Sequence, residues 1–433
     1  MLPHDELDCD VVVVGGGPGG AAMARLLALT GLETIVLESD SAIRVQYRGE
    51  LIQPSSATVL EAAGVASEVL ANACRISSME IHGRRRRLIR VGYGELGEGI
   101  SLLSIPVHRT REILLDHDTP PGMSVRLGAK VNGLITEDGV VRGVTYRGPG
   151  GEQLRVRARL VVGADGRYST IRKRAGIEAD IKRYAVQMVT MNTHSDGPAQ
   201  SALRLHVHSA HLMVLAPAPD GDVRIGWEIP AGSFPELRKQ PIETLVSQMI
   251  EHVPYAEPLA RQVDSWDKVH LQPLDTVFAH EWARDGLLLM GDAAHGVSPF
   301  GAQGLNLALH DALIGTPVIA EALRSGPYPS AQALGQLQQL RGRVCKGMIT
   351  AGNVILTISG PTFPQPVRET VMTIAGKLRG PNRIALPRLA MGTTGVRTNL
   401  AAARTAFDAL AAEAATVPAA RAKAAGAQQL PLG

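Results

Sequence analysis

Residues 9–20, CDVVVVGGGPGG, run from four consecutive valines into a glycine-rich turn. A continuous run of β-branched residues is typical of a central parallel strand that is buried on both faces. The residues that follow, GGAAMARLLALTG, indicate a helix that ends at Gly31, and ETIVLE indicates a second strand. The chain therefore opens with a predicted strand, helix and strand.

The turn matches the pattern G-x-G-x-x-G. Gly15 permits a tight turn, Gly17 lets the backbone approach a pyrophosphate, and Gly20 lets the helix, which begins at Pro18, pack closely on the strand. Glu38 ends the second strand eighteen residues after Gly20, where its carboxylate can accept hydrogen bonds from both hydroxyls of an adenosine ribose. We therefore predict a bound dinucleotide, either FAD or NAD, with its phosphates at the positive end of the helix.

Two later motifs decide between these dinucleotides. Residues 160–172, LVVGADGRYSTIR, place Asp165 at the end of a buried strand, and residues 287–306, LLLMGDAAHGVSPFGAQGLN, place Asp292 at the end of another. Asp292 can bind the ribityl hydroxyls that FAD has and NAD lacks, and the next helix start can face the negative end of a reduced flavin. The predicted cofactor-binding residues of the third motif, residues 287–306, are Gly291, Asp292, Pro299, Gly301, Gly304, Leu305 and Asn306. The predicted cofactor is FAD.

The three motifs, in this order and at these separations, resemble the fingerprints of the single-component (group A) FAD-dependent monooxygenases. These enzymes have the p-hydroxybenzoate hydroxylase fold and include the ubiquinone-biosynthesis-type hydroxylases. Arg48, in YRGELIQPS, matches the family's arginine near the flavin, and Arg109, in PVHRTREILL, is placed where a cofactor-facing polar residue is usual. Arg111 is close enough to be the equivalent residue instead. Ala302 stands where a second glycine is common.

The resemblance implies a reaction cycle. FAD would be reduced by NADH or NADPH and would react with O2 to a flavin C4a-hydroperoxide, which hydroxylates an aromatic or polyketide-like small molecule. The loop with Pro299 would lie beside the C4a edge of the flavin, and the turn at Asp165 would serve both FAD and the nicotinamide coenzyme. The cofactor would carry this chemistry while the protein supplies orientation and excludes water. The sequence has no second dinucleotide fingerprint, which agrees with transient binding of the coenzyme.

The alternation of helical and strand patterns predicts an α/β fold with a discontinuous Rossmann-like FAD-binding domain, an inserted β-rich substrate domain and a C-terminal helical segment. The predicted boundaries are 1–75, 105–179 and 271–328 for the FAD-binding domain, 76–104 and 180–270 for the substrate domain, 329–398 for the helical region, and 399–433 for an alanine-rich, partly disordered tail.

A histidine-rich strand offers a candidate base. In RLHVHSAH, His206 and His208 share one face of the predicted strand, and Leu205 and Val207 share the other. Because the inserted sheet roofs the substrate pocket in this fold, either histidine could deprotonate a phenol; an exposed strand face is the alternative. A metal site would need a third converging ligand, so none is predicted. We interpret His295, within the FAD motif, as structural.

Other functions on the same fold stay open: a halogenase, an epoxidase or a reductase. GWEIP resembles part of the Trp-x-Trp-x-Ile-Pro signature of flavin-dependent halogenases, but Ile225 occupies the position of the first tryptophan. A non-catalytic FAD-fold binding protein is disfavoured because Asp292 and the flavin-edge loop are both intact.

Composition limits the classes of partner. The 433 residues include 44 basic and 41 acidic side chains, a net charge of +3, which argues against a nucleic-acid-binding surface. The run Arg84–Arg87 is interpreted as a charged sheet edge rather than an anion site. Three widely spaced cysteines predict no disulfide framework. No apolar run reaches the roughly 18 residues that span a bilayer, so we expect a cytoplasmic protein. The resemblance implies a small-molecule substrate that is aromatic and apolar.

Overall fold

A mainly parallel sheet carries the glycine-rich turn. Its central strand β1 (Glu6–Val14) pairs in parallel with β2 (Thr34–Leu37) on one side and with β11 (Gln153–Gly163) on the other. The valines of β1 are buried, as their unbroken run predicts. This computed structural model describes residues 6–44, 51–84, 86–197, 201–208, 211–272, 274–299, 302–359, 370 and 394–416.

Further strands extend this sheet in the order β19-β20-β11-β1-β2-β8, with β9 and β10 attached to β11 as an antiparallel pair. The added strands are β8 (Met123–Arg126), β9 (Lys130–Glu137), β10 (Val140–Arg147), β19 (Ala283–Arg284) and β20 (Leu287–Leu289). Because β1, β11 and β20 run parallel, their carboxyl ends lie at one edge of the sheet. The turns at Gly15, Asp165 and Asp292 therefore come together there.

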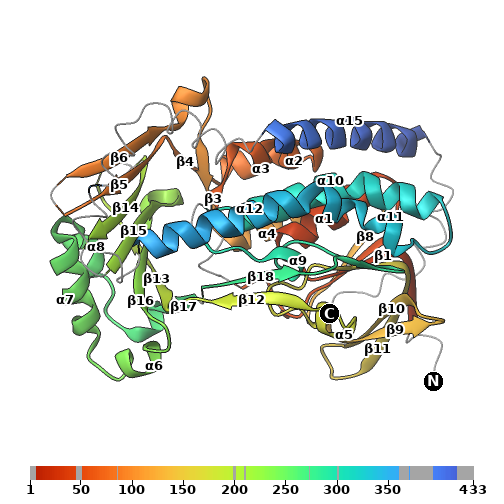
Figure 1. The fold of residues 1–433 in the computed structure, drawn as a ribbon, viewed down its shortest axis with the longest axis horizontal. Helices are drawn as coiled ribbons and strands as arrows, with labels where there is room; N and C mark the ends of the chain where they lie inside the picture. The colour runs from red at the N-terminus through yellow and green to blue at the C-terminus, as the bar shows by residue number, and fades with distance from the viewer. Residues whose placement is uncertain are drawn as a thin grey trace.

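Long helices pack beside this sheet (Figure 1). α1 (Pro18–Leu29) lies so close to α10 (Gly304–Arg324) that a Cβ on Gly19 would be 2.7 Å from the Cβ of Ala308. α4 (Val107–Asp116) contacts α1, while α12 (Gln336–Ser359) and α15 (Thr394–Thr416) both contact α10. The predicted C-terminal helical segment is thus present, and it packs on the helices that follow the cofactor motifs.

A second sheet has seven strands and combines two distant segments of the chain. Its order is β17-β13-β16-β15-β14-β5-β6, and β14 pairs in parallel with β5. The strands are β5 (Ser78–His82), β6 (Arg87–Gly92), β13 (Val186–His194), β14 (Ala202–His208), β15 (His211–Pro217), β16 (Asp222–Pro230) and β17 (His270–Gln272). The domain boundaries given above stay a prediction.

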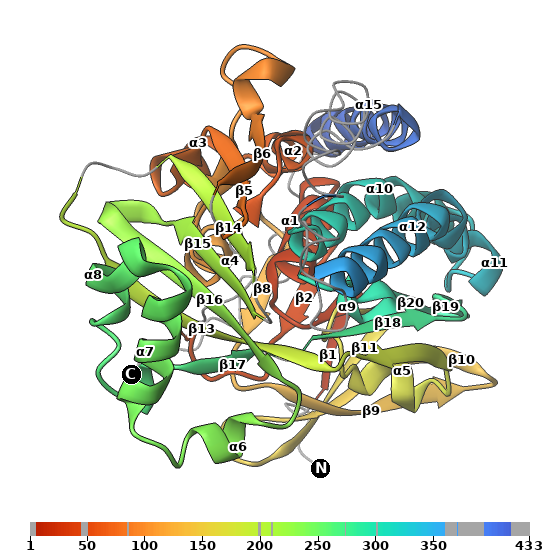
Figure 2. The same cartoon turned by 60° about the vertical axis from the view of Figure 1, so that its left-hand side comes forward.

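The two faces of the seven-stranded sheet differ in what covers them (Figure 2). The outer face is covered by α7 (Ile242–His252), the 3-10 helix η4 (Pro254–Ala256) and α8 (Glu257–Ala260). Trp227 and Met213 belong to this outer face, because they pack in one buried cluster with residues of α7. The inner face, which includes Val207 and Leu212, is turned toward the first sheet and its helices.

Shorter elements complete the described chain. Two small sheets consist of β3 (Leu51–Ile52), β7 (Leu102–Ser104) and β4 (Cys74–Ile76), and of β12 (Ala179–Arg183) and β18 (Asp275–Ala279). The short helices are α2 (Ala57–Ala62), α3 (Ala66–Ala71), α5 (Thr170–Arg174), α6 (Phe234–Leu237), α9 (Asp292–His295) and α11 (Ala331–Leu334).

The arginine-rich stretch lies at a sheet edge. β6 is the last strand of the seven, and Arg87 forms an ion pair of 3.0 Å with Glu80 on neighbouring β5. No helix in the described part of the chain is both long and apolar enough to cross a membrane. Within the same residues, no group of three or more His, Cys, Asp or Glu side chains is arranged to hold a metal ion.

Candidate functional site

The three glycines of the first motif have different surroundings. A Cβ on Gly15, whose φ is +108°, would lie 2.4 Å from the carbonyl oxygen of Ala164, and one on Gly20 would lie 2.1 Å from that of Gly15. A Cβ on Gly17 would have no atom within 4 Å. The fold itself therefore requires Gly15 and Gly20, whereas Gly17 borders open space at the start of α1, where a pyrophosphate fits.

Glu38 is fastened to this turn. Its Oε2 accepts a hydrogen bond of 2.8 Å from the Gly16 N–H and lies 3.0 Å from Nη2 of Arg111. Its Oε1 accepts from the hydroxyl of Ser39 and from the N–H of Asp40. Arg111 in turn donates from Nε to the carbonyl oxygen of Gly16 at 2.9 Å. A carboxylate and a buried guanidinium thus lie beside the predicted position of the adenosine half.

The arginine at the glycine turn is Arg111, whereas Arg109 lies away from that turn, so the predicted role of Arg109 in cofactor binding stays a prediction. Arg109 is two residues away on α4, so its side chain leaves the helix on nearly the opposite side. It is half exposed and donates to Glu112 Oε2 at 2.6 Å and to Asn72 Oδ1 at 3.0 Å. The alternative, Arg111, is the residue that the fold brings to the cofactor motifs.

Asp165 shapes the second turn. Its Oδ1 accepts a hydrogen bond from the Ser169 hydroxyl at 2.5 Å, and its Oδ2 accepts from the N–H groups of Thr170 and Ile171 at 2.6 and 3.1 Å. Burial raises the pKa of Asp165, and these hydrogen bonds oppose that rise. Asp165 therefore holds the start of α5, and any influence on a cofactor acts through the turn that it fixes.

Arg167 is a functional residue that the sequence analysis missed. It donates to Asp275 at 2.7 and 2.8 Å, to Asp292 Oδ2 at 3.0 Å and to the carbonyl oxygen of Val297 at 2.9 Å. Arg167 lies within the motif GADGRYSTIR, but the sequence does not indicate which groups its side chain contacts. One guanidinium therefore joins the second motif to Asp292 and to the loop that follows it.

Asp292 faces the start of α10. A Cβ on Gly304 would lie 3.8 Å from Asp292 Oδ1, and the Asp292 side chain remains about a third exposed, at 34%. Gly291, at φ +55°, sets the direction of this aspartate. A partly exposed carboxylate beside a helix N-terminus matches what the ribityl chain and the electron-rich ring of a reduced flavin need.

Asn306 has its side chain fully engaged in the protein. Oδ1 accepts from the N–H of Gln53 at 2.8 Å and from the hydroxyl of Ser56 at 2.7 Å, and Nδ2 donates to the carbonyl oxygens of Leu51 and Ala302 at 3.0 and 2.6 Å. Asn306 therefore fastens the flavin-edge loop to β3. A direct bond from this amide to a cofactor would require one of these contacts to break.

The flavin-edge loop is described in part. Pro299 accepts a hydrogen bond of 2.9 Å at its carbonyl oxygen from the N–H of Ala302, and Ala302 has φ +52°. Glycine adopts that conformation without cost and alanine does not, which explains why a glycine is common there. Leu305 lies in the first turn of α10 and packs at the edge of the main core. Arg48 and Gly301 lie outside the described residues.

A fully buried charged network lies behind this loop. Asp311 Oδ2 accepts from the N–H of Gly291 at 3.0 Å and also contacts His295 Nε2, while Oδ1 accepts from Arg341 Nε at 2.8 Å. Burial alone would lower the pKa of His295, but the Asp311 carboxylate raises it well above its ordinary value. A buried, protonated histidine is a poor base, so the structural interpretation of His295 fits this network.

His206 does not lie on the face of the sheet that is turned toward the first sheet, so its predicted place in the substrate pocket stays a prediction that this geometry does not support. His206 is paired with Met213, on the outer face of the sheet. Its Nε2 is 2.5 Å from the hydroxyl of Tyr255, near the outer helices, and its ring stacks on His82. His208 shares the backbone alternation of His206, and its side chain lies outside the described residues. Period-two spacing identified two faces correctly, but it did not indicate which one is turned inward.

Two features define the class of protein. The open space at Gly17 suits a dinucleotide, and Asp292 at the start of α10 suits the ribityl chain of a flavin. The chain is therefore a flavoprotein.

Comparisons with known proteins define the family. A model of the FAD binding domain family matches residues 8–329. The 6-methylpretetramide 4-monooxygenase of Streptomyces rimosus is 37% identical over 326 residues, which cover 74% of this chain and 78% of that enzyme. Squalene epoxidase 5 of Arabidopsis thaliana is 26% identical over 314 residues, 70% of this chain and 60% of the relative, so the chain spans less than two thirds of it.

The crystal structure of p-nitrophenol 4-monooxygenase PnpA from Pseudomonas putida DLL-E4 has the same fold, with a TM-score of 0.74 at 22% identity, covering 90% of this chain and 99% of that one. The chain belongs to the FAD-dependent monooxygenases, and FAD is its cofactor. The predicted resemblance, the α/β fold class and the cofactor are thereby confirmed.

Proposed function

We propose that this monooxygenase uses NADH or NADPH and O2 to hydroxylate an aromatic or polyketide-like small molecule. The observation that carries the proposal is the partly exposed Asp292, held by Arg167 at the start of α10. The similarity to 6-methylpretetramide 4-monooxygenase supports an aromatic or polyketide-like substrate. When bound and reduced, FAD supplies the activation of O2 for transfer of one oxygen atom.

The residues of this chain bind and orient the cofactor. The start of α1 attracts the pyrophosphate beside Gly17, and Arg111 adds a positive charge next to Gly16. The Glu38 carboxylate, which holds the Ser39 hydroxyl in this structure, would accept hydrogen bonds from the ribose hydroxyls. Arg167 keeps the Asp292 carboxylate in position for the ribityl chain.

The inner face of the seven-stranded sheet carries an apolar cluster that would help to exclude water from the space between the two sheets. Its buried members include Val207, Leu212 and Met188, which pack against Leu274 near the end of β17. An apolar wall of this kind suits the body of an aromatic substrate and protects a reactive oxygen species from water.

The direct test follows oxygen from labelled O2. FAD-loaded protein receives NADPH or NADH and a panel of mono- and polycyclic phenols, and products are weighed by mass spectrometry. We expect at least one phenol to accelerate coenzyme oxidation and to gain one labelled oxygen atom. If coenzyme is consumed and no panel member gains label, while hydrogen peroxide or a reduced product accumulates, hydroxylation of this substrate class is wrong.

Epoxidation is a second candidate function, favoured by the similarity to squalene epoxidase 5. The same experiment with alkene-bearing substrates separates the two, because an epoxide opens to a diol in acid and a phenol does not. Halogenation has no such support. Trp227 of the GWEIP stretch lies on the outer face, where it stacks on His211, and does not line the inner face.

A further inference from the structure

A cavity of about 670 Å³ lies where α3 and α4 meet the ends of β13, β15 and β16. Its lining contains none of the residues of the three cofactor motifs. The volume is in the range of small-molecule sites, roughly 300–1,000 Å³. The polar residues that matter for what it binds are Asn72, His108, Arg109, Asn192, Asp222 and Arg224.

Two arginines bring positive charge to this cavity, one from α4 and one from β16. Arg224, on β16, is buried with 8% exposure, and its guanidinium lies 3.4 Å from the side-chain oxygen of Asn192. Arg109, on α4, has a side chain that is 47% exposed and pairs with Glu112 at 2.6 Å; an exposed ion pair of this kind is weak, so a ligand anion can compete for the guanidinium. The positive charge of Arg224 therefore forms part of a fixed wall, and that of Arg109 forms part of a mobile rim.

His108 adds a hydrogen-bonding group between them. Its Nδ1 is buried and has no hydrogen-bond partner among the residues that the structure describes. Burial lowers the pKa of His108; the Glu112 carboxylate opposes this, and the charges of Arg109 and Arg224 lower the pKa further. The ring is therefore neutral near pH 7 and can offer a hydrogen bond to a ligand in the cavity.

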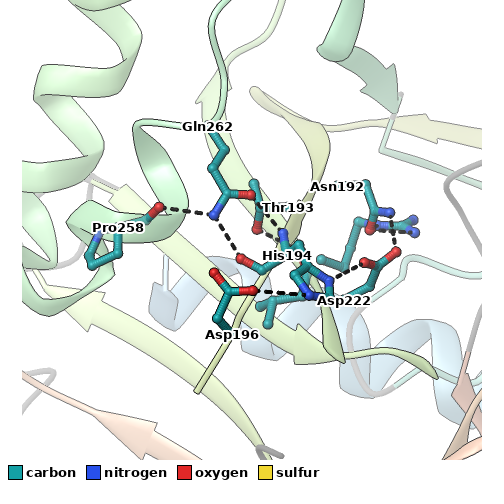
Figure 3. A network of polar contacts seen from close by, with 9 residues as sticks. Asn192, Thr193, His194, Asp196, Asp222, Pro258 and Gln262 are labelled. Carbon is teal, nitrogen blue, oxygen red and sulfur yellow. Dashed lines mark hydrogen bonds and ion pairs between the residues drawn. The ribbon is translucent and has the colours of Figure 1, made fainter. Parts of the chain in front are cut away.

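The acidic residues of the cavity do not cancel this charge equally. Asp222 is already engaged, because it accepts from Asn192 Nδ2 at 2.8 Å and lies 3.1 Å from His194 Nδ1 (Figure 3). Gln262 fixes His194 in turn, since it accepts from the His194 N–H at 2.8 Å and donates to its carbonyl oxygen at 2.7 Å. Asp220 is exposed, in the turn before β16. Asp220 therefore lies at the exposed rim of the cavity, and Asp222 is already bonded to Asn192 and His194 in its wall.

We propose that this cavity binds an anionic oxygen group, a carboxylate, a phenolate or enolate, or a phosphate, between Arg109 and Arg224 with His108 as a further hydrogen-bond partner. The inference rests on the proposed function, because the anion belongs either to the substrate or to the nicotinamide coenzyme. If the substrate occupies the site, the substrate class narrows to aromatic molecules that carry an ionised oxygen group. If the coenzyme occupies it, the anion is one of the coenzyme's phosphates.

The thiol of Cys74 provides a measurement that does not depend on catalysis. Cys74 lines the cavity and is partly exposed, whereas Cys345 is buried. Burial raises the pKa of both Cys74 and Cys9, so alkylation is run at alkaline pH and the Cys74 rate is compared only between samples at the same pH. FAD-loaded protein is alkylated with iodoacetamide at matched ionic strength, and the rate at Cys74 is followed by peptide mass spectrometry. Cys74→Ser identifies the labelled peptide.

The probes are 4-hydroxybenzoate, its neutral amide, inorganic phosphate and NADPH. We expect at least one anionic probe to slow alkylation of Cys74 and the amide to have no effect. Protection by 4-hydroxybenzoate assigns the anion to the substrate, and protection by NADPH and phosphate assigns it to the coenzyme. Absence of protection by every anion, or equal protection by the amide, overturns the proposal.

A matched pair of variants tests the arginine. Arg109→Gln should raise the concentration of the anionic probe that gives half-maximal protection about fivefold, because the variant loses one partly exposed positive charge. Arg261→Gln, which removes a similarly exposed arginine paired with Glu257 on α8, should leave it unchanged. An unchanged concentration in Arg109→Gln contradicts the site. Flavin content and oxygen transfer are measured separately, so a protein that fails the proposed function still gives a protection result.

Discussion

Gly17 and Gly20 belong to one motif, yet their surroundings assign them to different tasks. A Cβ on Gly20 meets the backbone at 2.1 Å, while a Cβ on Gly17 meets nothing within 4 Å. The sequence pattern groups them because a dinucleotide site needs both. Only the structure separates the glycine that the fold needs from the one that the ligand needs.

Gly17→Val should therefore weaken FAD binding while the protein stays folded, because its side chain enters the space beside the start of α1. Gly20→Val should instead lower the free energy of unfolding even without FAD. Equilibrium titration with FAD and urea unfolding of the flavin-free protein measure the two effects. Tight FAD binding by Gly17→Val would refute the assignment of this space to the pyrophosphate.

Ala302 stores backbone strain that a glycine would relieve. At φ +52°, alanine costs roughly 1–2 kcal/mol, and part of this is returned by the greater freedom of glycine in the unfolded chain. We expect Ala302→Gly to stabilise the protein by about 0.5–1 kcal/mol in urea unfolding. The control Ala401→Gly, on the exposed side of α15, should destabilise by about 1 kcal/mol. Equal destabilisation by both would contradict the strain at position 302.

The choice between Arg109 and Arg111 shows what a motif leaves open at this scale. Both arginines fit the sequence spacing, but two residues on a helix project about 200° apart, so only one can face the glycine turn. The facing side of α4 is set by its packing against α1, through contacts between residues about 90 positions apart. A single sequence does not reveal such contacts.

At the scale of elements, α12 supports the loop that carries Asp292. Arg341 of this helix donates to Asp311 of α10, and Asp311 holds the N–H of Gly291, directly before Asp292. The family match ends at residue 329, before α12 begins. The cofactor loop thus depends on a helix outside the matched region.

Arg341→Met should lower the free energy of unfolding by about 3–5 kcal/mol, because it leaves Asp311 buried without one of its two cationic partners. FAD should also dissociate faster, since the turn at Gly291 loosens. Arg343→Met, exposed on the same helix, is the matched control and should change neither quantity. If the two variants behave alike in unfolding and in FAD release, α12 does not support the loop.

The buried pair of His295 and Asp311 predicts a pH dependence. The folded state raises the pKa of His295 above 6.5, so its contribution to stability is complete below about pH 6.5 and is lost as pH rises toward the folded pKa. The lowered pKa of Asp311 makes its contribution available above about pH 3.9. The stability difference between wild type and His295→Gln, measured from pH 5 to 9, should shrink above pH 6.5. A difference that grows with pH would show that His295 is neutral.

The second sheet illustrates what alternation can and cannot predict. Turn residues and apolar residues predict its strands. The period of two along β14 also predicts that positions 206 and 208 share one face of the strand. Which face is covered depends on α7 and α8, which lie about 40 residues further along the chain. The alternation alone therefore could not predict that His206 lies under the outer helices.

At the scale of the whole molecule, the sequence predicted the fold class and the cofactor from three turns at one sheet edge. Glycines and aspartates at strand ends form local patterns, so they can be recognised from a single sequence. Arg167, Arg341 and the engaged side chain of Asn306 depend on partners 125, 30 and 253 positions away. Those contacts required the structure.

The central claim is that this chain is a flavoprotein whose Asp292 helps to hold FAD. The most direct measurement is the FAD released per chain on denaturation, together with the dissociation constant from titration of the flavin-free protein. We predict about one FAD per chain for wild type and for Asp264→Ala, an exposed aspartate on the other side of the molecule, and at least about tenfold weaker binding for Asp292→Ala. A wild-type protein that takes up no FAD, or an Asp292→Ala variant that binds it as tightly as wild type, would contradict the account.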